Sequence, residues 1–105
     1  MEFKANTDRG ICEAEVEGEL TIYHVNEFKK ELEKAIKKAA SFKLDLAKVS
    51  EIDTSCFQLL MQAQNACQEN DKEFELTAVS PAVKEVMEIF GMVNHFAGYN
   101  GAVNN

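Results

Sequence analysis

Segments with the two-residue period of a β-strand alternate along this chain with segments that have the period of an α-helix. From Ile11 to Glu17, apolar and acidic side chains alternate, which predicts a half-buried strand. Residues 2–7 predict a short first strand, and Asp8-Arg9-Gly10 predicts a turn after it. Residues 42–46 and 74–77 predict two more strands. Residues 20–23 continue extended after Gly18, and residues 93–96 are compatible with a short last strand. This alternation requires crossover connections between strands and so constrains the fold strongly.

Three helical segments separate these strands. Asn26 is a good N-cap, and apolar residues at helical spacing follow it to about Ala39. A second helix is predicted for residues 56–67, and Ser80-Pro81 predicts the start of a third that ends at Gly91. We therefore expect an α/β fold with a mixed central sheet of four to five strands and about three helices packed on it. The length of 105 residues suits one domain, 1–105, with residues 98–105 as a flexible tail.

The bulk composition argues against several classes of protein. A net charge of -7 disfavours nonspecific binding to nucleic acid or to anionic lipid. Three cysteines without a CxxC motif argue against a disulfide framework and against a zinc site. The first residues are polar, and no apolar run approaches the ~20 residues of a membrane span. We expect a soluble cytoplasmic protein without direct membrane insertion.

The sequence also lacks the familiar elements of an active site. There is no Gly-rich phosphate loop, no HExxH and no GxSxG, and the two histidines, His24 and His95, lie far apart. We therefore expect no enzyme activity, no cofactor and no metal. One alternative stays open for Asp45 and Asp53, which are expected to flank one loop after a buried strand. They would hold a divalent cation there, position a donor nucleotide during phosphoryl transfer, or cap the loop through Asx turns.

That loop is the candidate site. It ends in Asp53, Thr54, Ser55 and Cys56 just before an apolar periodic run, so the two hydroxyls lie at or near a helix N-cap. A phosphate on either hydroxyl would face backbone N–H groups at the positive end of the helix dipole. Cys56 has two readings: a reactive thiol whose pKa the dipole lowers, or a small residue packed beneath the loop.

Four short segments together resemble the STAS domain of bacterial anti-sigma factor antagonists. They are Gly18-Glu19-Leu20, Leu44-Asp45-Leu46, Ile52-Asp53-Thr54-Ser55 and Ser80-Pro81-Ala82-Val83-Lys84, and the likeness runs from about Ile11 to Phe96. The resemblance implies a regulatory binding module that a serine kinase, itself an anti-sigma factor, switches by phosphorylation.

By position in that family, Ser55 is the phosphorylated residue and Thr54 the second choice. Asp45, Asp53, Thr54, Ser55 and Cys56 then form the partner-binding loop. Two positions depart from the family's Asp-Ser-Ser-Gly loop, since Thr54 replaces a serine and Cys56 replaces the glycine.

The chain also resembles a shorter STAS branch. That branch includes stand-alone domains of sensory or chemotaxis complexes and the small cytoplasmic subunit of a phospholipid-trafficking ABC transporter. Many of its members lack the phosphorylatable serine, and the threonine of the Asp-Thr pair is taken to contact the partner. The alternative function is therefore a constitutive subunit that binds through the Thr54 corner without phosphorylation.

Overall fold

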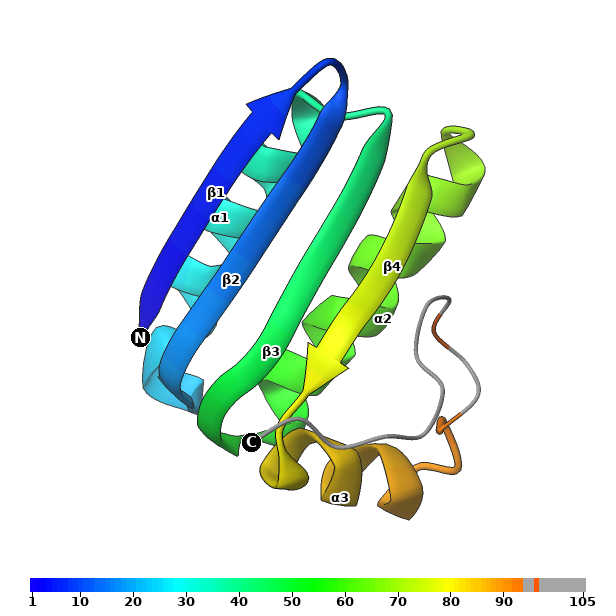
Figure 1. Cartoon of the computed structure of the whole chain (residues 1–105). Coiled ribbons are helices and arrows are strands. Elements are labelled where there is room, and N and C mark those ends of the chain that lie inside the picture. Colours follow the sequence, from blue (N-terminus) through cyan, green and yellow to red (C-terminus); the bar gives the residue numbers. More distant parts are fainter. Residues whose placement is uncertain (94–95, 97–105) are drawn as a thin grey trace.

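The computed structural model describes residues 1–93 and residue 96, and the described part has a four-stranded mixed sheet and three α-helices. The strands lie in sequence order: β1 (Glu2–Asp8), β2 (Ile11–Leu20), β3 (Ser41–Ile52) and β4 (Glu73–Val79). The first two are antiparallel, and β2, β3 and β4 run parallel to one another (Figure 1). The predicted α/β fold with a mixed sheet is confirmed.

The antiparallel pair is joined by the predicted tight turn. Asp8 pairs with Ile11, so only Arg9 and Gly10 lie in the loop. Both have positive φ values, 53° and 80°, as a type I′ hairpin requires. The turn therefore sets the register of β1 on β2.

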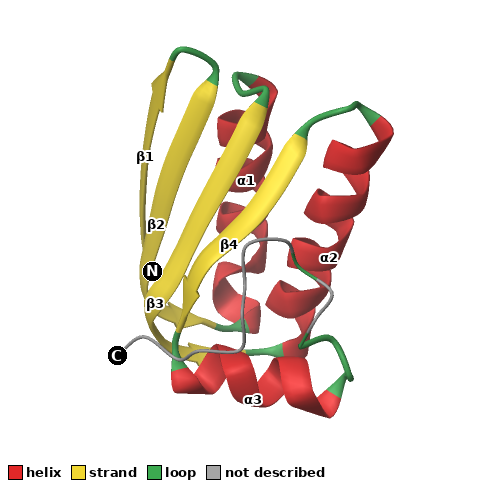
Figure 2. Cartoon of the chain, turned by 45° about the vertical axis from the view of Figure 1, so that its right-hand side comes forward, coloured by secondary structure: helices red, strands yellow, loops and turns green. Residues whose placement is uncertain are grey.

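The two longer helices are the crossovers between parallel strands. α1 (Val25–Lys37) joins β2 to β3, and α2 (Thr54–Glu69) joins β3 to β4. Both lie on the same face of the sheet, side by side (Figures 1 and 2). The other face of the sheet carries mainly charged side chains. The core lies between the sheet and these helices, and its largest fully buried side chains are Phe28, Phe42, Phe57, Leu20, Leu44, Leu46, Leu60, Leu76 and Met87.

The third helix, α3 (Pro81–Ile89), lies across the end of the molecule where β3 and β4 finish (Figures 1 and 2). It starts as the sequence predicts, because the Ser80 hydroxyl accepts a hydrogen bond of 3.3 Å from the Val83 N–H, and Pro81 follows the cap. It ends at Ile89, and Gly91 follows with a φ of 66°.

Three predicted details are wrong. Residues 22–24 are not extended but form a short 3-10 helix, η1 (Ile22–His24). α1 begins at Val25 with His24 as its N-cap, so Asn26 lies inside the first turn. β3 does not end near residue 46 but continues to Ile52, so the loop predicted between this strand and the next helix is absent. Half of the predicted last strand (residues 94 and 95 of 93–96) and all of the predicted tail (98–105) lie outside the described residues.

Candidate functional site

Asp53 lies at the point where β3 passes directly into α2, and it ties this junction to the end of β2. Its N–H donates to the Leu20 carbonyl at 2.9 Å. Its carboxylate accepts a hydrogen bond of 2.8 Å from the N–H of Ile22, the first residue of η1. Asp53 is the N-cap of α2, but its side chain makes no capping bond to that helix. Its carboxylate therefore positions η1 beside the start of α2.

The two hydroxyls that follow Asp53 differ in exposure. Thr54 is the first residue of α2 and is exposed. The Ser55 Oγ atom is buried, although other atoms of the residue reach solvent, and it meets no hydrogen-bond partner at proper geometry in the described structure. Both lie at the positive end of the helix, where a negative charge is favoured. Of the two residues, Thr54 is the more exposed, and the Ser55 hydroxyl oxygen is turned away from solvent.

Cys56 packs beneath this corner. Its side chain is fully buried, and its Sγ donates to the Thr21 carbonyl at 3.4 Å. Burial raises the pKa of the Cys56 thiol, and the Asp53 carboxylate adds to the rise, while the nearby Ser55 hydroxyl partly offsets it. The direction is opposite to the lowered pKa that a reactive thiol requires. The geometry favours the reading of Cys56 as a small packing residue.

Beside Thr54, η1 presents two large apolar side chains to solvent. Ile22 is 61% exposed and Tyr23 is 92% exposed. The Thr21 Oγ1 and the His24 Nδ1, which flank them, lie 3.2 Å apart and close the turn. This 3-10 helix was not predicted from the sequence, because the apolar run after Gly18 is also compatible with a continued strand. A signal was present: two adjacent apolar residues break the alternation that β2 keeps up to Glu17.

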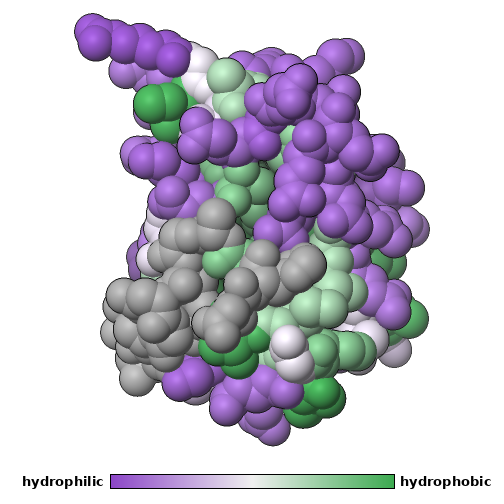
Figure 3. Space-filling model, turned by 90° about the vertical axis from the view of Figure 1, so that its right-hand side faces the viewer, coloured by the Kyte–Doolittle hydropathy of each residue, from purple (hydrophilic) through white to green (hydrophobic). Residues whose placement is uncertain are grey.

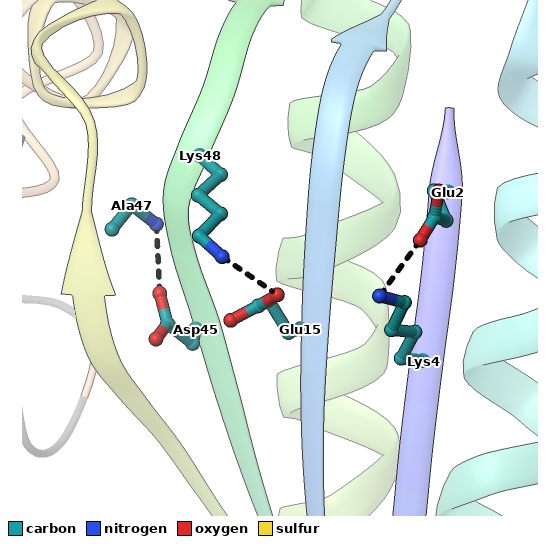
Figure 4. A network of polar contacts seen from close by, with 6 residues as sticks. All are labelled: Glu2, Lys4, Glu15, Asp45, Ala47 and Lys48. Atoms are coloured by element: carbon teal, nitrogen blue, oxygen red, sulfur yellow. Dashed lines mark hydrogen bonds and ion pairs between the residues drawn. The ribbon is translucent and has the colours of Figure 1, made fainter.

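Asp45 does not belong to this corner, and its predicted place in the loop is wrong. It lies within β3, where seven further strand residues (46–52) separate it from Asp53. Its carboxylate accepts a hydrogen bond of 2.8 Å from the Ala47 N–H, at a register shift between β3 and β4 (Figure 4). It shares the open face of the sheet with the Lys48–Glu15 pair. Asp45 and Asp53 therefore cannot share one cation in this fold.

Among residues 1–93 and 96, no three side chains of His, Cys, Asp or Glu come together as metal ligands would. None of the helices in this part of the chain is long and apolar enough to cross a membrane.

The comparisons with known proteins agree with the fold. The family described as "Mlab, STAS domain" matches residues 7–96. The chain therefore belongs to the STAS domain family, as the resemblance implied. This is a regulatory binding fold rather than a known family of enzymes. No curated protein matches the chain significantly in sequence.

Solved structures of anti-sigma factor antagonists share the fold at low identity. One from Mycobacterium paratuberculosis has a TM-score of 0.77 at 17% identity, covering 93% of this chain and 84% of that one. The Bacillus protein SpoIIAA in its phosphorylated form has a TM-score of 0.70 at 18% identity, covering 87% and 85%. A sulfate transporter family protein from Wolinella succinogenes has a TM-score of 0.68 at 20% identity, covering 86% and 74%.

Proposed function

We propose that this chain is a regulatory module that binds a protein partner through the start of α2 and η1. The observation that carries the proposal is the exposed Thr54 hydroxyl at a helix N-terminus beside the exposed Ile22 and Tyr23. Aromatic and aliphatic side chains next to an oriented polar group are typical of the centre of a protein interface. The hydrogen bond from Ile22 to Asp53 holds the apolar and polar parts of this surface in one arrangement.

The proposed switch is phosphorylation at this surface. A phosphate adds about -1.5 to -2 charge at neutral pH. It would meet the dipole of α2 favourably and the Asp53 carboxylate unfavourably, and a partner surface shaped for a neutral hydroxyl would lose its fit. By family position the acceptor is Ser55. Exposure favours Thr54, because a kinase reaches Ser55 Oγ only after the side chain rotates outward.

Two classes of partner fit this proposal. The structural neighbours that are anti-sigma factor antagonists favour a serine kinase or anti-sigma factor. The family description favours the constitutive alternative, a subunit of a transporter or sensory complex that contacts its partner through Thr54 without phosphorylation. Both readings place the protein in the cytoplasm and assign it no catalytic step of its own.

The experiment that separates these readings begins with the protein isolated from its native host. Intact mass before and after phosphatase treatment shows whether about 80 Da is lost, and peptide mapping assigns it to Thr54 or Ser55. We expect the phosphate on Thr54. An unmodified mass under all growth conditions would remove the switch and leave the constitutive reading.

Partner binding is then tested with variants of the exposed hydroxyl. Once a partner has been recovered by pulldown, Thr54→Asp is expected to lower the affinity for it at least about tenfold, because a charge enters the contact surface. Thr7→Asp, also an exposed threonine, lies on β1 and is the matched control. If Thr54→Asp and Thr7→Asp both bound as tightly as the unaltered protein, the corner would not be the binding site.

A further inference from the structure

An open hollow of about 290 Å³ lies between α1 and α2, which run side by side on one face of the sheet (Figure 2). Apolar side chains from both helices form its floor: Leu32, Ile36, Leu59, Ala63 and Ala66. The two alanines are small, so α2 leaves space between the helices that a larger side chain would fill. None of the residues that line the hollow belongs to the surface proposed above for a protein partner.

The charged side chains that border this hollow come from α1. Lys29, Glu33 and Lys37 recur there at a spacing of four residues, whereas Gln62 is the polar residue that α2 contributes. The ammonium groups of Lys29 and Lys37 make no hydrogen bond or ion pair among the described residues. The lining of the hollow therefore carries one positive charge in excess, although the whole chain has a net charge of -7.

We propose that the hollow binds a medium-chain aliphatic carboxylate, with the chain on the apolar floor and the carboxylate at Lys29. Burial of the methylene groups favours the chain, and a charge-assisted hydrogen bond from the ammonium favours the head group. Lys37 is the last residue of α1, where the backbone carbonyls disfavour an anion. Glu33 repels a carboxylate from the middle of the hollow, so the head group is expected at the Lys29 end.

The size of the hollow separates this ligand from a helix of another protein. From Lys29 to Lys37, α1 advances about 12 Å, at about 1.5 Å per residue. A helix of that length and about 10 Å in width has about three times the volume of the hollow. One unbranched chain is narrow enough to enter. A cationic head group would be repelled by the two lysines, and a neutral one would leave both without an ion pair.

The test is a titration of the isotope-labelled full chain with decanoate below its micelle concentration, followed by amide NMR shifts. We expect the amides of Ile36, Leu59 and Ala63 to shift and to saturate with a submillimolar dissociation constant. Octanoate is shorter by two methylene groups and is expected to bind about tenfold more weakly. Decyltrimethylammonium has the same chain length as decanoate but a cationic head, and it is expected to leave these amides unshifted.

Four variants test the assigned roles. Lys29→Glu is expected to weaken decanoate binding at least about tenfold, and Glu33→Gln is expected to strengthen it. Lys30→Glu makes the same change of charge at an exposed position of α1 outside the hollow, and it is the matched control. Ala63→Leu fills the hollow and is expected to abolish binding, while urea denaturation shows that the variant is folded.

Three results would overturn this proposal. Decanoate would shift none of the amides of the hollow, or octanoate would bind as tightly as decanoate, or Lys29→Glu would bind as tightly as Lys30→Glu. A protein partner that shifts the Leu59 and Ala63 amides, where decanoate does not, would likewise exclude the carboxylate as the occupant. The partner surface at Thr54 is tested separately, because none of these variants alters it.

Discussion

α1 and α2 have the same place in the fold but opposite surfaces. Each is a crossover between parallel strands, and each buries aromatic and aliphatic side chains against one face of the sheet. More than half of α1 is charged, whereas α2 carries Glu69 as its one charged residue. Both helices therefore stabilise the core, but their exposed sides have different chemistry.

The ends of the two helices differ as well. Neither helix has a side-chain capping bond at its start, but the Asp53 carboxylate at the start of α2 accepts a hydrogen bond from the Ile22 N–H of η1. The end of α1 is held by Lys72, whose Nζ donates to the Ile36 carbonyl at 2.8 Å.

Apolar side chains gather at the end of the molecule where α3 lies, as Figure 3 shows, and Ile89 is 73% exposed there. Exposed apolar side chains therefore lie on η1 and α3, the elements near the start of α2.

The largest effect is expected where the two helices are alike. Phe28 of α1 and Phe57 of α2 are both fully buried, and replacing either by Ala is expected to cost about 3–5 kcal/mol of unfolding free energy. Phe57 belongs at the upper end, because its ring stacks on Phe90 at 5.4 Å and meets Phe96 at 6.1 Å. Urea denaturation measures both, with Gln58→Ala as the exposed control, expected within about 0.5 kcal/mol. A cost well below about 3 kcal/mol at Phe57 would contradict the packing of α2 into the core through this side chain.

A smaller effect is expected at the helix starts. Asp53→Ala removes the acceptor of the Ile22 N–H and is expected to cost about 1 kcal/mol, reduced from the value for a buried charged acceptor because the site reaches solvent. Asp53→Asn keeps an acceptor oxygen and is expected to cost less than half of that. Urea denaturation gives both values, and hydrogen exchange at the Ile22 amide reports the bond directly. Equal exchange in all three proteins would show that the carboxylate does not hold η1.

The end of α1 gives a third test. Lys72→Met removes the ammonium from the last carbonyls of the helix and is expected to cost about 0.5–1 kcal/mol. Lys30→Met removes the same charge from the exposed side of α1 outside its last turn, where the ammonium makes no hydrogen bond or ion pair among the described residues, and is expected to cost nothing measurable. If both variants lost the same stability, the effect would come from net charge and not from the cap.

Much of the fold is legible in the sequence because local signals and the core agree. The alternation in β2, the Asp8-Arg9-Gly10 turn and the Ser80-Pro81 cap each have one physical reading, and the structure confirms all three. The resemblance to the STAS family could also be seen in the sequence, because motif residues such as Asp53, Thr54 and Ser55 are contiguous in the chain.

The second half of β3 could not be predicted from the sequence, because its pairing with β2 is irregular. The second half of β3 pairs with β2 through register shifts, so Val49 and Ile52 are both buried at a spacing of three residues. That spacing conceals a strand from any rule based on a period of two. Because the second half of β3 was not predicted, Asp45 was expected beside a loop that does not exist. The sequence also does not show that Thr54 is more exposed than Ser55. Both carry hydroxyls at a helix start, and only tertiary packing separates them.

The smallest effect concerns the thiols of α2, which α1 lacks. Burial raises the pKa of Cys56 and of Cys67, although Lys72 works against the rise at Cys67. Above the usual thiol pKa the unfolded chain loses these protons first, so unfolding releases protons and stability falls as pH rises toward the folded-state pKa. We expect Cys56→Ala to flatten this fall above neutral pH, as measured by urea denaturation at several pH values. Rapid alkylation of Cys56 at neutral pH would contradict the raised pKa. It would also mean that the first turn of α2 carries a reactive thiolate. α2 would then no longer differ from α1 by its lack of charge at this turn.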